Sequence, residues 1–336
     1  MQPDCLKITP LLTVAIPTYN RADLLDLCLT RIEEEISSLN IDQRRLIKMY
    51  VSNNASIDHT SEVIRQHQLR WHGEFEVVSN PENIGGERNV AQCYVAAKTP
   101  YVWILGDDDV ILKGKLQRVL DVLTEQQVDI LYVNGYSYSG CYLDEPARGR
   151  GKTGVIKYTD SLDFVRRTHI MLTFITALIV RSGANIESSM GIVAGSNLPQ
   201  LGWVLQLIRE GHSFVFMEDR VYAAKIANSG GYGAINVFGS NLLNISNSML
   251  KTKPELAKAI QNGAVVMWFP TYVMNLRQGD AVYAEENIVI EIRRVFHSNW
   301  RYYFFISPLI SLPITFARLY FIFIRLIRHF FRHLLI

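Results

Sequence analysis

Three consecutive aspartates, Asp107, Asp108 and Asp109, are the residues of this sequence whose type and spacing most directly suggest chemistry. They follow residues 101–105, an apolar run of strand-favouring residues. Because adjacent carboxylates repel one another and suit strands poorly, the strand is expected to end there, with the carboxylates at its carboxyl end. Ligands bind at that end of the strands in open α/β sheets. Clustered carboxylate oxygens predict a Mg²⁺ or Mn²⁺ site shared with substrate phosphates, the alternative being a solvated acidic turn or helix cap.

Three polar loops precede the aspartates, and each follows its own predicted strand. Strands are expected over residues 11–16, 47–51, 75–78 and 101–105, with helices between them. This alternation predicts an α/β fold with a Rossmann-like, mostly parallel sheet whose loops converge on one edge. Gly85 lets the backbone approach a phosphate, and Arg88 offers a donor fork for one. Asn53 and Asn83 can hydrogen-bond to a base, although singly each of these four residues is more typical of a turn or cap.

The loops and the aspartates together resemble the motifs of family 2 glycosyltransferases. Four ordered segments carry the resemblance: AIPTYNR at 15–21, NNASIDHT at 53–60, NIGGERN at 83–89 and GDDD at 106–109. The last segment is similar to that of abequosyltransferase-like bacterial members, which build surface polysaccharides such as lipopolysaccharide. The resemblance implies a GT-A fold, an inverting mechanism, a nucleoside-diphosphate sugar as donor, and Mn²⁺ or Mg²⁺. The acceptor that we expect is a lipid-linked saccharide.

The resemblance also assigns roles to individual residues. The positions expected to contact the donor are Pro17, Thr18, Tyr19, Arg21, Asn53, Asn83, Gly85, Arg88, Asp107, Asp108 and Lys225. Asp109 and Asp108 are the expected metal ligands of the DxD motif. Its register stays open, because the motif begins either at Asp107 or at Gly106. Asn53 stands where the family has a base-contacting aspartate, which leaves the base of the donor open.

No motif identifies the catalytic base. The acidic pair that carries it in the family falls at Pro199 and Gln200, where no carboxylate is present. An inverting transfer needs a carboxylate within hydrogen-bond reach of the acceptor hydroxyl, and Glu187 and Asp219 are the candidates. The missing pair also supports an alternative, a non-catalytic sugar-nucleotide-binding or scaffold protein at the membrane. A nucleotidyltransferase of the same fold would need a glycine-rich basic signature near the N-terminus, which we do not find.

The bulk composition narrows the class of protein. The chain has 336 residues, 49% of them apolar, which is enough for a full core. A formal net charge of +2 argues against a nucleic-acid partner. The four cysteines form no CxxC pair, which argues against a zinc ribbon or disulfide framework and fits a reducing cytoplasm. No signal peptide is expected at the N-terminus.

The last residues predict contact with a membrane surface. Residues 302–317 are uncharged, but Pro308 and Pro313 interrupt them, so a spanning helix is not expected. The basic residues beyond them fall within an arc of about 140° on a helix. They are Arg318, Arg325, Arg328, His329, Arg332 and His333. Aromatic and aliphatic residues occupy the opposite side, which predicts an amphipathic interfacial helix, the alternatives being a core helix or a dimer face. We expect residues 300–336 to hold the protein, peripherally or monotopically, on the cytoplasmic face of the inner membrane.

The rest of the chain completes the expected organisation. Further strands are predicted over residues 130–134, 174–181 and 214–217, and helices over 241–299. The glycines at 230–233 predict either a lid over the donor or a surface loop. We expect a GT-A domain over residues 1–235, divided into a nucleotide-sugar part (1–125) and an acceptor part (126–235). A helical extension (236–299) and the amphipathic helices (300–336) would follow.

Overall fold

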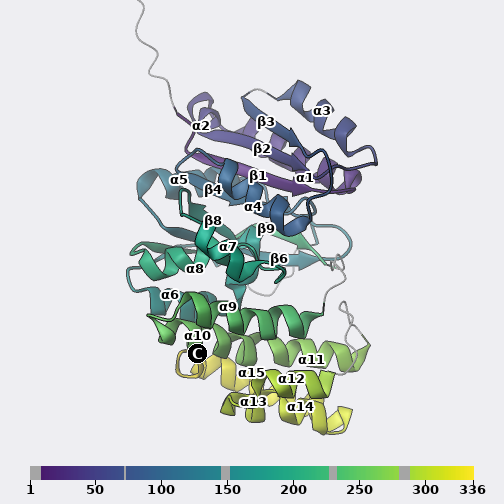
Figure 1. The fold of residues 1–336 in the computed structure, drawn as a ribbon, viewed down its shortest axis with the longest axis vertical. Coiled ribbons are helices and arrows are strands. Elements are labelled where there is room, and N and C mark those ends of the chain that lie inside the picture. The colour runs from purple at the N-terminus through teal and green to yellow at the C-terminus, as the bar shows by residue number, and fades with distance from the viewer. Residues whose placement is uncertain (1–8, 72, 145–151, 227–232, 280–287) are drawn as a thin grey trace, which may run out of the picture. The chain divides into compact units, whose positions relative to one another are not determined.

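The computed structural model describes residues 9–71, 73–144, 152–226, 233–279 and 288–336, and its elements are labelled in Figure 1. The chain forms two compact units that interleave along the sequence. The first unit comprises Met1–Thr159, Phe174–Asn185 and Gly211–Ile226. The second unit comprises Asp160–Thr173, Ile186–Glu210 and Ala227–Ile336. The division expected at residues 125, 235 and 299 stays a prediction.

The first unit is built on one sheet of nine strands among the described residues. In spatial order they are β3 (Glu74–Ser79), β2 (Ile47–Asn53), β1 (Leu12–Thr18), β4 (Tyr101–Ile104), β8 (Leu178–Arg181), β6 (Ile130–Tyr138), β9 (Phe214–Lys225) and β5 (Val110–Ile111), with β7 (Val155–Tyr158) also on β9. The first four strands of the chain are parallel, as predicted. Strands β8, β5 and β7 pair antiparallel with their neighbours, so the sheet as a whole is mixed.

The register of the sheet brings the polar loops to one edge. Thr18 at the end of β1 pairs with Asn53 at the end of β2, and Asn53 pairs with Ser79 at the end of β3. On the other side of β1, the Leu105 N–H donates to the Ala15 carbonyl at 2.9 Å. The loop after β4 therefore opens at the same edge as the three earlier loops. The predicted convergence of these loops is confirmed.

Helices α1 (Ala22–Ser38), α2 (Ile41–Arg45), α3 (Thr60–Arg70), α4 (Gly86–Ala96) and α5 (Lys115–Glu125) connect these strands. Helix α1 begins with an unexpected cap. Asn20 lies outside the helix in a left-handed conformation (φ 52°). The Ala22 N–H instead donates to Asp58 Oδ2 at 3.2 Å, and Asp58 Oδ1 accepts from the Thr60 N–H at the start of α3. One carboxylate thus satisfies the free amides of two helices, an arrangement that short-range sequence patterns do not reveal.

The strand predicted over residues 174–181 is shorter than expected. Only β8 is extended, and a 3₁₀ turn, η2 (Ile175–Ala177), precedes it. A hydrogen bond from Trp103 Nε1 to the Thr176 carbonyl, at 2.8 Å, helps to fix this turn. Strand β9, in contrast, is longer than the predicted 214–217, because it pairs with β6, β5 and β7 along its length. Residues 227–232, which include part of the predicted glycine-rich lid, lie outside the described residues.

The second unit is helical. Its α-helices are α6 (Ser161–Thr168), α7 (Glu187–Val193), α8 (Leu201–Glu210), α9 (Leu242–Met249), α10 (Pro254–Gly263), α11 (Phe269–Gln278), α12 (Ile288–Phe296), α13 (Trp300–Phe305), α14 (Ser307–Ser311) and α15 (Ile314–Leu335). Two π-helical segments, η3 (Asn236–Asn241) and η4 (Ala264–Trp268), interrupt this series. No helix within the described residues has both the length and the apolar content needed to cross a membrane.

Candidate active site

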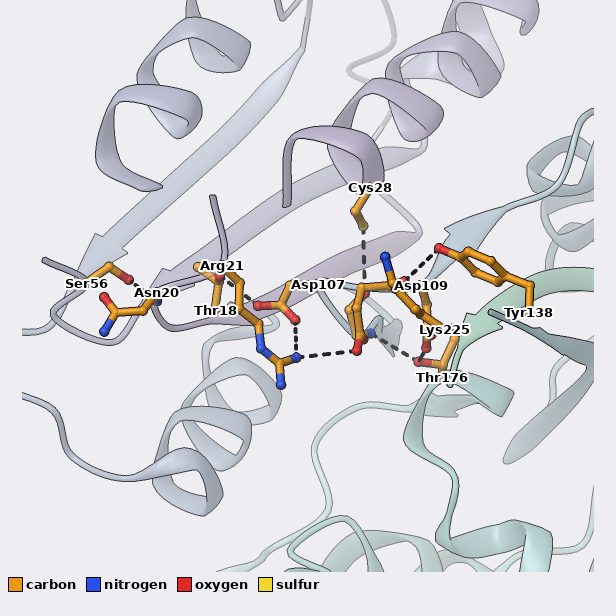
Figure 2. A network of polar contacts seen from close by, with 12 residues as sticks. Thr18, Asn20, Arg21, Cys28, Ser56, Asp107, Asp109, Tyr138, Thr176 and Lys225 are labelled. Atoms are coloured by element: carbon orange, nitrogen blue, oxygen red, sulfur yellow. Dashed lines mark hydrogen bonds and ion pairs between the residues drawn. The ribbon is translucent and has the colours of Figure 1, made fainter. Parts of the chain in front are cut away.

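Asp107 is held by residues of β1 and of the loop that follows it. Its side chain is buried, with 5% of the residue exposed. Thr18 Oγ1 donates to Oδ2 at 2.8 Å, and Arg21 Nη1 donates to Oδ1 at 3.0 Å. Figure 2 shows Thr18 and Arg21 approaching the aspartates from one side. Both oxygens of Asp107 therefore already accept a hydrogen bond from the protein.

Asp109 is held from the opposite side and is equally buried. Thr176 Oγ1 donates to Oδ2 at 2.6 Å, and the Lys225 N–H donates to Oδ1 at 3.3 Å (Figure 2). The Thr176 hydroxyl also accepts the Gly106 N–H at 3.0 Å, so the same side chain fixes the start of the aspartate turn. The expected donor contact at Lys225 reaches the cluster through its backbone amide.

Asp108 is the member of the run that is most open to solvent. Its side chain is 16% exposed, against 6% for Asp107. Arg21 Nη1 lies 3.4 Å from its Oδ2, and the Tyr138 hydroxyl donates to its backbone carbonyl at 3.4 Å. A cation that enters from solvent would meet the Asp108 carboxylate first.

The aspartate run concentrates negative charge in a buried place. Burial raises the pKa of Asp109 to about 8, with a further contribution from the charge of Asp108. Burial also raises the pKa of Asp107 to about 6, although the charge of Arg21 opposes the rise. For Arg21, burial opposes the charged form, but the carboxylates outweigh it and its pKa is raised. Burial and the mutual repulsion of the aspartates disfavour their ionised forms, and a further cation beside them would relieve both effects.

The turn that carries the aspartates leaves little room for a side chain at position 106. A Cβ atom at Gly106 would stand 3.0 Å from Asp108 Oδ1 and 3.0 Å from Asp109 Oδ2. The Cys28 thiol donates to the Gly106 carbonyl at 3.7 Å from the buried face of α1. Burial, reinforced by the nearby aspartates, raises the pKa of Cys28 well above its ordinary value, so the thiol stays protonated as this donor.

The second polar loop is held together by its own amides. Asn53 is almost fully buried. Its Oδ1 accepts from the Ser56 N–H at 3.1 Å, and its Nδ2 donates to Ser61 Oγ at 3.1 Å. Asn54, which the sequence did not single out, donates to Asn83 Oδ1 at 2.8 Å and thereby ties the second loop to the third. Its position next to Asn53 was the available signal.

The third loop presents backbone and charge to solvent. Gly85 has φ 87°, in the left-handed region that favours glycine, and its N–H donates to Asn83 Oδ1 at 2.9 Å. Arg88 is exposed in the first turn of α4. In the first loop, Tyr19 is 40% exposed, and Pro17 is paired within β1. These expected donor-binding residues lie in the loops of the same sheet edge.

The two expected catalytic carboxylates belong to different elements, β9 and α7. Asp219 lies within β9, where Lys115 Nζ donates to it at 2.9 Å and the Gly154 N–H at 3.1 Å. Burial tends to raise the pKa of Asp219, but Lys115 outweighs this effect and the pKa is lowered. Glu187 is the exposed first residue of α7 and belongs to the second unit. The identity of the base stays a prediction.

Sequence reasoning missed two residues that bring the site together. Thr176 contacts Asp109 and Gly106, and Tyr138 contacts Asp108, yet both lie far along the chain from the aspartates. Thr176 was hidden inside an apolar segment that predicts an ordinary strand. Among the described residues, no three His, Cys, Asp or Glu side chains are arranged to enclose a metal ion alone. The oxygen-only donor set nevertheless suits a hard cation whose other ligands come from substrate and water.

The sheet order and the carboxylate edge define the class of protein, a GT-A glycosyltransferase. The family model described as "Glycosyl transferase family 2" matches residues 13–185, which is just over half of the chain. The chain belongs to this family, and both the predicted family and the predicted fold class are confirmed.

Two curated relatives are similar to part of the chain. Abequosyltransferase RfbV of Salmonella typhimurium is 33% identical over 135 residues, which cover 40% of this chain and 38% of the relative. The uncharacterized glycosyltransferase MG025 of Mycoplasma genitalium is 27% identical over 154 residues, covering 44% of this chain and 47% of the relative. Each match therefore spans less than half of the relative.

Solved structures with the same fold match nearly the whole chain. Staphylococcus aureus TarS 1-349 in complex with UDP superposes with a TM-score of 0.59 at 15% identity, covering 94% of this chain and 88% of that one. Mannosyltransferase PcManGT from Pyrobaculum calidifontis, in complex with GDP-Man and Mn²⁺, gives 0.52 at 17% identity, covering 96% and 88%. At these identities the likeness establishes the fold alone.

Proposed function

We propose that this protein is an inverting glycosyltransferase that uses a nucleoside-diphosphate sugar and a divalent cation. Its acceptor is a lipid-linked saccharide in the synthesis of an O-antigen-like bacterial surface polysaccharide. The observation that carries the proposal is the pair of buried aspartates, Asp107 and Asp109, whose pKa values burial raises, at the edge where the loops converge. The similarity to an abequosyltransferase supports the pathway.

Mn²⁺ or Mg²⁺ fits the aspartate run. Asp108 is a direct ligand in this proposal, because its side chain is more exposed than that of Asp107 (16% against 6%). When bound, the cation supplies a positive charge beside the diphosphate leaving group. The related fold in complex with GDP-Man and Mn²⁺ supports a cation of this kind.

The donor diphosphate would be held by groups of the chain itself. Arg21 is within reach of two aspartates and is 36% exposed, so its free donors can turn to a phosphate. Arg88, which is exposed, offers further donors at the same edge. The second loop would take the base, with Asn53 keeping that loop in shape. TarS in complex with UDP or UDP-GlcNAc supports a nucleotide-sugar donor.

The acceptor hydroxyl needs a proton acceptor, for which we favour Glu187 over Asp219. Asp219 is already neutralised by Lys115, which makes it a poor base. A second candidate function rests on Gln200, which stands at the family's acidic pair. Its amide donates to the Thr173 carbonyl, a bond that a carboxylate would not form. If no carboxylate serves as base, the protein binds sugar nucleotides without transferring the sugar.

The acceptor also suggests where the protein acts. We propose that residues 300–336 place the enzyme on the cytoplasmic face of the inner membrane, peripherally or monotopically. The support is the basic and aromatic composition of this segment and the exposed aromatic side chains of α13 and α15.

Donor hydrolysis and transfer, assayed with EDTA, Mg²⁺ or Mn²⁺ and a panel of uridine, guanosine, cytidine and thymidine diphosphate sugars, test the function. We expect turnover that depends on the cation. Asp108→Asn should lower it by about a hundredfold or more, because the variant loses a charged contact in a desolvated site. The exposed Asp23, whose side chain is 97% exposed, provides the control Asp23→Asn. Binding without turnover would favour the non-catalytic alternative. Absence of both binding and turnover would refute the proposal.

A further inference from the structure

Helix α15 is held on the second unit by one side of its surface. Ala317 and Ile324 are fully buried, and Arg328 is 8% exposed. At 100° per residue these three lie within about 40° of one another. The Tyr320 hydroxyl donates to the Phe304 carbonyl of α13 at 2.8 Å, and Arg301 Nε donates to the Leu335 carbonyl at 2.6 Å. The rotation of α15 about its axis is therefore fixed.

Arg328 corrects the sequence-based assignment. It was expected among the basic residues that face lipid headgroups, but it is buried. Arg328 Nη1 donates to the Val266 carbonyl at 3.1 Å and to the Met267 carbonyl at 3.2 Å, both in η4. A π-helical segment breaks the regular hydrogen-bond ladder, and Arg328 uses the carbonyls that this leaves available. Burial lowers its pKa to about 10, so it remains charged at neutral pH.

A second side of α15, separate from this buried face, is apolar and exposed. Phe316 is 61% exposed, Leu319 61%, Phe323 49%, Leu326 56% and Phe330 65%. Their spacing places all five within an arc of about 80°, and we call this set the apolar stripe. Large contiguous apolar surfaces on a folded protein mark sites of interaction. With respect to the described residues, every side chain of the stripe is at least 49% exposed.

The third side of α15 is basic. Arg318 and Arg325 are exposed, about 120° to 140° around the axis from the centre of the apolar stripe. No Asp or Glu occurs anywhere in residues 292–336. If a second copy packed stripe against stripe, these arginines would gather without any carboxylate on the helix to pair with them. An anionic lipid surface supplies the missing negative charge.

We infer that α15 lies in the plane of an anionic bilayer. The apolar stripe enters the boundary between headgroups and acyl chains, Arg318 and Arg325 contact lipid phosphates, and Arg328 holds the helix on the protein. This inference deepens the proposed function, since a lipid-linked acceptor would be met at that surface. It does not depend on catalysis, because the groups involved belong to α15 alone.

Co-sedimentation of the full-length protein with phosphatidylcholine vesicles, with or without phosphatidylglycerol, tests the inference. We expect binding only to the anionic vesicles. The double variant Phe323→Ser and Phe330→Ser should weaken binding about tenfold or more. Exchanging Arg318 and Arg325 for Gln should weaken it about fivefold for each charge removed. The matched control is Leu69→Ser with Val95→Ser, which removes two exposed apolar side chains from the first unit (Leu69 is 73% exposed, Val95 54%).

Three results would overturn the inference. One is unchanged vesicle binding by the stripe double variant. Another is equal binding of the control pair and the stripe variant. A third is a wild-type dimer that the stripe variant converts to monomer while vesicle binding persists, which would identify a second copy as the occupant. Donor hydrolysis, measured in parallel, separates the two proposals: the stripe variant should keep it, whereas failure of the proposed function would appear as no hydrolysis in any variant.

Discussion

Replacing Asp109 by Asn should make the metal-free protein more stable at alkaline pH. In the wild type, burial and the neighbouring Asp108 raise the pKa of Asp109 to about 8. In the unfolded chain the same group has a pKa of about 3.9. Because the folded value is the higher one, the contribution of this group to stability is fully present below about pH 4 and is lost as the pH rises through about 8. Asn does not titrate, so the variant escapes this loss.

The size of the effect follows from the shift. A difference of about 4 pKa units corresponds to roughly 5 kcal/mol at about 1.4 kcal/mol per unit. Local relaxation around an ionised Asp109 will reduce this figure, and we expect about 2–4 kcal/mol in favour of Asp109→Asn at about pH 9. Below about pH 4 the two proteins should be nearly equal, since the wild-type carboxyl is then protonated in both the folded and the unfolded chain. Asp107, whose pKa burial raises to about 6, affects both proteins alike.

Urea unfolding in EDTA across this pH range measures the difference, with Asp23→Asn as an exposed control. The wild-type unfolding free energy should fall relative to that of Asp109→Asn as the pH rises. Adding Mn²⁺ at about pH 9 should restore the wild type more than the variant, because a bound cation offsets the ionised carboxylates. Parallel pH profiles for the two proteins would refute the reasoning, because they would mean that Asp109 ionises as freely when folded as when unfolded.

Two further predictions concern glycines. Gly106→Ala should weaken Mn²⁺ binding about tenfold, measured by calorimetry, because its methyl group would stand 3.0 Å from the carboxylates of the aspartate run. Gly140→Ala, where the methyl meets open space, should leave the affinity unchanged, and an equal loss in both would contradict the steric reason. Gly263→Ala should lower the unfolding free energy by about 3 kcal/mol, since its Cβ would lie 2.2 Å from that of His169. Nucleotide binding per folded molecule should not change, and an unchanged denaturation midpoint would count against this prediction.

The first half of the site was predictable because its information is local. Each strand in the N-terminal part is an apolar run that ends in a polar loop, and parallel pairing then brings the loop ends together. The register of Thr18 with Asn53 follows from the hydrophobic pattern, which fixes which face of a strand is buried. The aspartates lie at the same edge because they closely follow the carboxyl end of β4.

The second half depends on long-range contacts that no local pattern reveals. Thr176 meets Asp109 across a separation of 67 residues, and its role depends on a 3₁₀ turn inside an apolar segment. Helical periodicity predicted α15 and its amphipathic character correctly. It placed Arg328 on the solvent side, however, because angle alone does not tell which polar residue finds buried carbonyls. A tertiary partner, η4, decided that.

Burying the aspartate run lowers the stability of the folded protein, and binding a ligand offers a reason for this loss. Burying Asp107 and Asp109 raises both pKa values, which means that each is disfavoured as an anion in the folded chain. Packing alone gives no reason to keep such residues, since an apolar pair of similar size would be easier to bury. Thr18, Arg21 and Thr176 nevertheless position both carboxylates with hydrogen bonds of 2.6–3.0 Å. Buried carboxylates that are held in place yet disfavoured as anions are prepared for a positive charge that arrives from outside, and Asp108, the most exposed of the three, is the one such a charge would meet first.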